Sequence, residues 1–274
     1  MKQLRTIRII LALLFLASSV AAVLLGPAAC PVTRIARGSQ VLLCSLGASA
    51  GASLIWLLLT LMFGRIYCAT VCPVGTFSDI FMRLRQVFPR SRRKFSYAHA
   101  KRVRYHILLI YAICALAGIT AVTLMLDPWN IFTDIVGAAS PHVAAAQWKA
   151  VGLGALSGMV AGAAIAVVLA VLAALRGREF CTTVCPLGTV LGMLSDYAIY
   201  HIEINPDKCT SCGLCEDVCR ASCIKTVSRY VDNSRCVRCF DCVARCPEEA
   251  IKFQPNRNRP ATPLMRRVKT TSKT

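Results

Sequence analysis

Apolar residues form four long runs along this chain, and each run is almost free of charged side chains. The runs cover Ile9–Ala29, Val41–Gly64, Tyr105–Leu126 and Ala150–Leu175. Because an α-helix rises about 1.5 Å per residue, each run can cross the roughly 30 Å hydrocarbon core of a bilayer. The pattern therefore predicts a membrane all-α domain with four transmembrane helices. Of the 274 residues, 56% are hydrophobic and 16% are charged, a composition that excludes an ordinary soluble single-core enzyme.

Basic residues are concentrated in one of the short connections between the runs. The connection Arg65–Arg104 holds ten Lys and Arg residues against one acid, Asp79, whereas Asp127–Lys149 holds a single Lys. The positive-inside rule then places both termini and the basic connection in the cytoplasm. We read the net charge of +19 as a sign of topology and lipid contact rather than of nucleic-acid binding. The expected location is a bacterial inner membrane, crossed several times.

An internal repeat follows the second and the fourth run. Gly64–Thr76 and Gly177–Thr189 are identical at nine of thirteen positions, at a constant offset of 113 residues, and each contains Cys-x3-Cys-Pro. Each copy closes a pair of apolar runs, so residues 1–199 form a duplicated helical hairpin in this interpretation. The duplication is expected to bring four thiols together on the cytoplasmic side, those of Cys68, Cys72, Cys181 and Cys185.

Three interpretations of these four thiols stay open. Four converging sulfurs suit an iron–sulfur cluster or another metal centre. They also suit a redox-active dithiol, whose thiolates need a lowered pKa. The third interpretation is structural, because free cysteine is a common small buried residue.

Residues 200–253 carry the most specific motif of the chain. Two runs with the spacing Cys-x2-Cys-x2-Cys-x3-Cys begin at Cys209 and Cys236. In two-cluster ferredoxins the fourth cysteine of each run binds the cluster of the other run. One predicted [4Fe–4S] cluster is therefore bound by Cys209, Cys212, Cys215 and Cys246. The other is bound by Cys236, Cys239, Cys242 and Cys219. We expect a small α+β ferredoxin domain here, and the doubled spacing disfavours zinc.

The remaining cysteines and two unusual positions complete the pattern. Arg220 replaces the proline that normally follows the fourth cysteine, and should alter the local turn or field without removing a ligand. Cys223 is interpreted as a packed free thiol. Thirteen of the sixteen cysteines fall on the predicted cytoplasmic side, where thiols stay reduced. A disulfide between Cys30 and Cys44 on the other side stays open, and the basic segment 254–274 is expected to be disordered.

With these motifs the chain resembles the NapH-type membrane ferredoxin family, from the first apolar run to Ile251. Members of that family are quinol dehydrogenase components of periplasmic nitrate reductase systems, and relatives serve methylamine utilisation and the assembly of nitrous-oxide reductase or copper oxidase. The resemblance implies electron exchange with quinone and with a second iron–sulfur protein or cytochrome. It implies at most one component of a larger enzyme. The alternative is an accessory protein that supplies electrons for maturation of a metalloenzyme.

Clusters on one face cannot carry electrons across about 30 Å of hydrocarbon, so a mobile quinone or a partner must complete the route. Two groups of residues are candidates for a quinone site. Asp127, Trp129 and His142 mark an outer one, and Tyr67, Asp79 and Phe180 mark an inner one. The competing interpretation is that the aromatic residues anchor the chain at the interface and that the acids are merely solvated.

Overall fold

The computed structural model describes residues 2–25, 50–87, 95, 97–98, 102–118, 125–148 and 155–255. Each of the four apolar runs contains a helix in this structure: α1 (Lys2–Leu25), α3 (Ala50–Phe63), α6 (Val103–Leu116) and α10 (Ala155–Arg176). The possible disulfide between Cys30 and Cys44, and residues 256–274 of the basic tail, lie outside the described residues. Predictions about them are therefore untouched.

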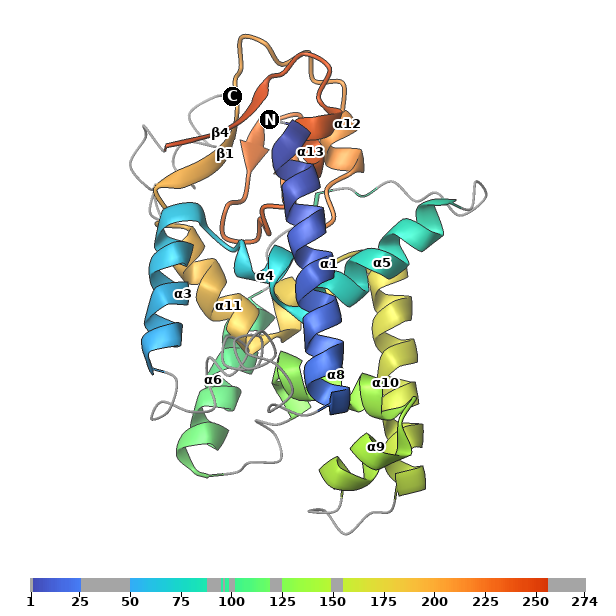
Figure 1. Cartoon of the computed structure of the whole chain (residues 1–274). Helices are drawn as coiled ribbons and strands as arrows, with labels where there is room; N and C mark the ends of the chain where they lie inside the picture. The colour runs from blue at the N-terminus through green and yellow to red at the C-terminus, as the bar shows by residue number, and fades with distance from the viewer. Residues whose placement is uncertain are drawn as a thin grey trace.

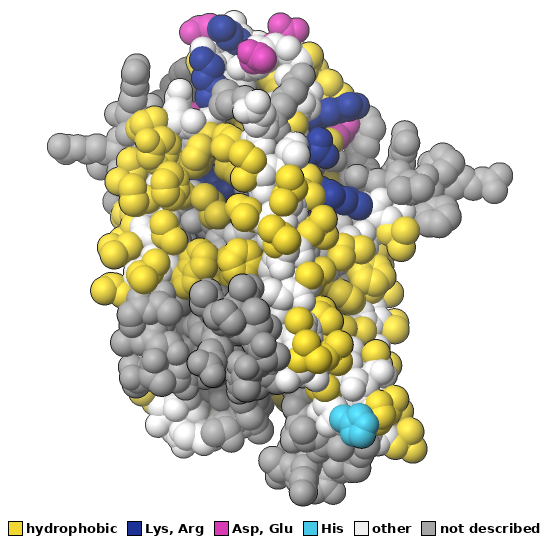
Figure 2. Space-filling model, viewed as in Figure 1, with side chains coloured by type: hydrophobic (Ala, Val, Ile, Leu, Met, Phe, Trp, Pro, Cys, Tyr) yellow, Lys and Arg dark blue, Asp and Glu magenta, His cyan; other side chains and the backbone are white. Residues whose placement is uncertain are grey.

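Two of the helices are long and apolar enough to cross a membrane, Gln3–Leu25 and Leu156–Arg176. Both expose large apolar side chains, among them Leu14 on α1 and Val167 on α10, which are more than half exposed. A core helix of a soluble protein would bury such side chains. Figure 2 shows hydrophobic side chains gathered over the middle of the molecule and charged ones at one end. Two membrane helices are thus supported, and the spans predicted for the second and third runs, which contain α3 and α6, stay predictions.

The two copies of the repeat fold in the same way. In the first copy α4 (Tyr67–Thr70) leads into α5 (Pro73–Val87), and in the second the π-helical turn η3 (Phe180–Val184) leads into α11 (Pro186–Ser195). The backbone N–H of Cys72 donates to Tyr67 O at 3.0 Å, and that of Cys185 donates to Phe180 O at 3.0 Å. Both bonds span five residues, a wide turn that is common at functional sites. Proline at the first position then starts the next helix in each copy.

The connection 127–149 contains two helices that the hydrophobic pattern alone did not predict, α8 (Pro128–Gly137) and α9 (Pro141–Trp148). Both pack against α10, and α8 also contacts α5 and α1. The close packing depends on Gly162, where a Cβ atom would collide with the carbonyl oxygen of Asp134. The start of α8 carries a recognisable signal, because Asp127 caps it through Asn130 N at 3.4 Å and Pro128 follows.

The C-terminal module consists of two small two-stranded sheets and two short helices. Strand β1 (Tyr200–Ile204) pairs antiparallel with β4 (Ile251–Pro255), so the first and last strands of the module lie side by side. The second sheet is a hairpin of β2 (Ile224–Lys225) and β3 (Tyr230–Val231). Helices α12 (Leu214–Asp217) and α13 (Asp241–Arg245) follow the two cysteine loops. As Figure 1 shows, this module sits at the end of the molecule where α1 begins.

Candidate metal centres

The two cysteine loops of the module share one backbone conformation. Ser211 and Arg238 have φ values of 56° and 54°, and Gly213 and Phe240 have φ values of 80° and 59°. Each pair is related by the 27-residue offset that also relates the two cysteine runs. A left-handed conformation costs a residue with a side chain about 1–2 kcal/mol, so its repetition at Arg238 and Phe240 indicates a constraint. Alternation of this kind curls a loop around an anion and points its amides inward.

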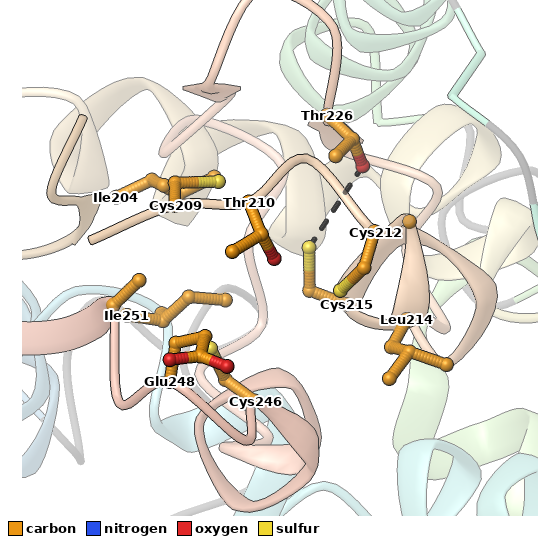
Figure 3. Close-up of a pocket in the computed structure, with 12 residues that line it drawn as sticks. Ile204, Cys209, Thr210, Cys212, Leu214, Cys215, Thr226, Cys246, Glu248 and Ile251 are labelled. Atoms are coloured by element: carbon orange, nitrogen blue, oxygen red, sulfur yellow. Dashed lines mark hydrogen bonds between the residues drawn. The ribbon is translucent and has the colours of Figure 1, made fainter. Parts of the chain in front are cut away.

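The first predicted ligand set lines a single cavity of about 20 Å³, which also involves Ile204 and Ile251. Figure 3 shows the side chains of Cys209, Cys212, Cys215 and Cys246 around this space. Thr226 lies beside the set, with its Oγ1 3.8 Å from the sulfur of Cys215. Four thiols around an apolar space are the donor set that a cubane cluster requires. The residues present therefore fit the predicted group.

The second predicted set is buried more deeply. Its members, Cys219, Cys236, Cys239 and Cys242, are each at most 9% exposed. Burial raises the pKa of Cys242, and the charges of the other three thiols raise it further. Cys223 lies among them, with its sulfur 3.4 Å from that of Cys219. This thiol is packed as predicted, and it directly contacts one predicted ligand.

The side chain of Arg220 is buried and connects the module to the helices below it. It lies 2.9 Å from Asp79 of α5 and 2.7 Å from Asp241 of α13. Its carbonyl accepts the backbone N–H of Arg178 at 2.9 Å. The expectation of a purely local effect at this position was therefore incomplete, because the arginine joins two parts of the chain that lie far apart in sequence.

The twin Cys-x3-Cys-Pro segments are held together by two reciprocal hydrogen bonds. Arg65 of the first copy donates to Cys181 O at 2.8 Å, and Arg178 of the second copy donates to Cys68 O at 2.6 Å. Both arginines are at most 1% exposed. Gly75 and Gly188 leave room for the two cysteine carbonyls, since a Cβ atom at Gly75 would collide with Cys68 O and one at Gly188 with Cys181 O.

The thiols of the twin segments are buried and close to one another. Burial, and then the neighbouring charge of Cys181, raises the pKa of Cys72. Burial also raises the pKa of Cys181 to about 11, although the nearby charge of Arg178 opposes the shift. Burial at Cys72 and Cys181 thus acts against the thiolate form that a redox-active dithiol needs. Within the described residues no three His, Cys, Asp or Glu side chains converge on a single metal ion.

Asp79, a member of the inner quinone candidate, is the centre of a buried ion cluster. Its carboxylate pairs with Arg8, with Arg178 at 2.8 Å and with Arg220 at 2.9 Å. Although burial acts to raise the pKa of Asp79, these three cations hold it well below its usual range. A permanently ionised, fully paired carboxylate holds elements together and is a poor proton acceptor for quinol.

The other candidate residues for a quinone site differ in their surroundings. His142 is exposed on α9, and Trp129 lies beside Phe132 with a centroid distance of 6.3 Å. Tyr67 is buried, contacts Trp56 edge-on at 5.1 Å, and has its pKa raised by burial and then by charges that include Asp127. The outer candidate Asp127 and the inner candidate Tyr67 thus belong to one region of the structure.

Sequence reasoning missed the roles of Arg8, Arg65 and Arg178. A signal was available for two of them, because Arg65 and Arg178 occupy equivalent and identical positions in the repeat. Arg8 carries no such signal. It directly precedes the first apolar run, yet it is buried and donates to Ala69 O and to Cys239 O, each at 3.2 Å.

Comparison with known proteins identifies the same two parts of the chain. Residues 47–95 and 159–200 match a family described as a 4Fe-4S binding domain, and residues 202–225 match a second family of the same description. The first match contains both Cys-x3-Cys-Pro segments, and the second contains the first cysteine run of the module. No solved structure matches the chain.

Several curated relatives cover most of the chain. The ferredoxin-type protein NapH of Haemophilus influenzae is 25% identical over 74% of this chain and 67% of the relative. The methylamine utilization ferredoxin-type protein MauN of Paracoccus denitrificans is 27% identical over 63% and 54%, and YccM of Escherichia coli is 24% identical over 70% and 51%. The chain thus spans about half to two thirds of these relatives. It is an iron–sulfur electron-transfer protein, similar over most of its length to the ferredoxin-type proteins NapH and MauN and to YccM.

Proposed function

We propose that this chain is a membrane-embedded subunit that moves electrons between the quinol pool and a partner redox protein. One observation carries the proposal: the buried cysteine set of the module rests directly on the repeat that ends the apolar helices. Arg8 of α1 donates to Cys239 O at 3.2 Å, and Arg65 donates to Ser234 O at 3.2 Å while it holds Cys181. An electron leaving the membrane domain therefore has a short route into the module.

The eight cysteines of the two runs are the proposed ligands of two [4Fe–4S] clusters, grouped as the spacing predicts. Each bound cluster would accept one electron at a time, whereas the oxidation of a quinol releases two electrons. The chain itself supplies the thiolates, the buried position and the electrostatic environment. The first set, with Cys212 exposed, is the natural contact point for a partner protein.

For the twin segments we propose a further metal or cluster site formed by Cys68, Cys72, Cys181 and Cys185. Three observations support it: the four thiols are buried together, the reciprocal arginines fix their backbone, and the matching family is described as a 4Fe-4S binding domain. A bound metal would deprotonate these thiols, whereas burial alone keeps them neutral.

Quinol is proposed to bind between Tyr67 and the start of α8, with Asp127 as the acceptor of a quinol proton. Burial raises the pKa of Asp127 to about 6, which suits a group that takes and releases protons near neutral pH. Phe132 belongs to the apolar core around Tyr67, and Trp56 packs against that core and contacts Tyr67. Both side chains are proposed to contact the quinone ring. The membrane would be the source of this substrate, and the exposed apolar side chains of α1 and α10 support this proposal.

A quinol oxidation assay tests the proposal. The full chain in lipid vesicles is mixed anaerobically with a menaquinol analogue, and bleaching of the cluster absorbance is followed with time. We expect the wild type to bleach and Cys239→Ser to lose much of the change. A wild type that bleaches with dithionite but never with quinol would overturn the proposal and favour an accessory function fed by another donor.

A further inference from the structure

Buried arginines surround the second cysteine set far in excess of buried acids. Six guanidinium groups in this region are at most 5% exposed, and three carboxylates are buried with them. The arginines are Arg8, Arg65, Arg178, Arg220, Arg235 and Arg238. The acids are Asp79, Asp232 and Asp241.

Four of the six arginines are paired with these acids. Asp79 forms ion pairs with Arg8, Arg178 and Arg220, and Asp232 forms one with Arg235 at 2.9 Å. Arg65 and Arg238 have no carboxylate partner among the residues that the structure describes. The Nε atom of each is buried and has no hydrogen-bond partner there.

Both unpaired arginines lie against the second set. Arg238 stands between Cys236 and Cys239 in the loop, and its Nη2 donates to Tyr200 O at 3.2 Å. Arg65 bridges Ser234 O, two residues before Cys236, to Cys181 O. Both guanidinium groups are thus held beside the loop that carries Cys236 and Cys239.

An isolated buried charge is expensive, so two unpaired guanidinium groups require a nearby anion. A cubane held by four thiolates carries a net negative charge, and reduction by one electron increases that charge. Fixed cations beside it therefore favour the reduced form. Burial acts in the opposite direction, because a low dielectric penalises the extra charge. Arg65 and Arg238 act against this penalty, as does Arg104, which is 8% exposed and donates to Ser234 Oγ at 3.5 Å.

The first cysteine set has a different environment. Glu248 lines its cavity and Cys212 is exposed to solvent. The arginine in contact with it, Arg229, is itself exposed and lies 3.5 Å from Cys209 O. Solvent screens an exposed charge of this kind strongly.

We infer that Arg65 and Arg238 make the cluster site at Cys219, Cys236, Cys239 and Cys242 the higher-potential one of the two, and therefore the site that exchanges electrons with the membrane carrier. The inference rests on the proposed function, since it requires both cysteine sets to hold clusters. It also gives the module an order: the inner set faces the membrane domain, and the outer set faces the partner.

The test is a potentiometric titration of the full chain in lipid, with soluble mediators and without quinone, read by low-temperature EPR. Arg65→Gln and Arg238→Gln should each lower the higher-potential transition by at least tenfold in the one-electron equilibrium, about 59 mV. The lower-potential transition should stay in place. Arg229→Gln, the matched control at the outer set, should shift neither transition by a comparable amount.

Two further variants separate charge from structure. Arg65→Lys and Arg238→Lys keep the cation and should keep the wild-type potential even where hydrogen bonds are lost. A shift confined to the lower-potential transition, or no shift in the glutamine variants, would overturn the inference. Iron and sulfide analysis of the wild type is done first, and a lack of two clusters would contradict the proposed function itself.

Discussion

Arg65 and Arg178 form reciprocal hydrogen bonds between the two copies of the repeat. Each donates to the carbonyl of the first cysteine in the opposite copy, Arg65 at 2.8 Å and Arg178 at 2.6 Å. The exchange follows the 113-residue offset of the sequence and makes the two Cys-x3-Cys-Pro turns one unit. Arg178 also reaches Asp79, and through it Arg220 of the iron–sulfur module. The membrane domain and the module are therefore joined by buried charge.

Loss of the reciprocal bond should weaken the fold more than loss of an exposed arginine. Arg178→Gln removes a buried partner of Cys68 O and of Asp79, and we expect a loss of about 3–5 kcal/mol in the free energy of unfolding. Arg176→Gln is the control, because Arg176 is exposed and its pair with Glu179 at 3.2 Å lies at the surface. Denaturant unfolding in detergent gives the free energy of unfolding of both variants. Equal losses would show that the buried hydrogen bond stabilises the fold no more than the surface pair does.

Replacing Arg220 with the proline usual at this position should loosen the packing of the module against the helices without loss of its iron. Arg220→Pro removes the pairs with Asp79 and Asp241 but leaves all eight cysteines. Hydrogen exchange at Asp79 and in residues 196–199 should rise at least severalfold, while iron content stays at the wild-type value. Arg245→Gln changes an exposed arginine beside the other fourth cysteine and serves as control. Unchanged exchange in Arg220→Pro would contradict the docking role.

Cys223 should be dispensable for cluster assembly although its sulfur touches that of Cys219. Cys223→Ala leaves the two proposed ligand sets complete, so iron per chain should match the wild type. Cys219→Ala should lose about half of the iron bound by the module, because one of the two sets then lacks its crossing ligand. Iron loss in Cys223→Ala equal to that in Cys219→Ala would make Cys223 a ligand instead.

Quinol oxidation should depend on the ionisation of Asp127. Burial raises the pKa of this carboxyl to about 6, so the fraction able to accept a proton grows as pH rises through that value. The initial rate of quinol-dependent reduction should therefore increase about tenfold from pH 5 to pH 7. Asp127→Asn still caps α8, since asparagine is an equally good N-cap, and its rate should be low and insensitive to pH. A variant that keeps the wild-type profile would exclude Asp127.

The local part of this structure was readable from the sequence, and the long-range part was not. Ligand spacing is a local property, so Cys209, Cys212 and Cys215 could be grouped before any fold was known. The assignment of Cys246 as the predicted crossing ligand needed knowledge of how two-cluster modules pair their runs. The contacts of Arg8 with Cys239 and of Asp79 with Arg220 join segments whose distance in space no spacing reveals. Helix α8 was missed because its apolar face resembles an extension of the third run, although Asp127-Pro128 marks its start.

The measurement that tests the central claim most directly is low-temperature EPR of the anaerobically purified full chain in lipid, reduced either by a menaquinol analogue or by dithionite. The account predicts that quinol reduces the inner cluster fully enough to give a [4Fe–4S] signal, and that dithionite adds the outer one. A sample that stays silent with quinol and shows both signals only with dithionite would contradict it.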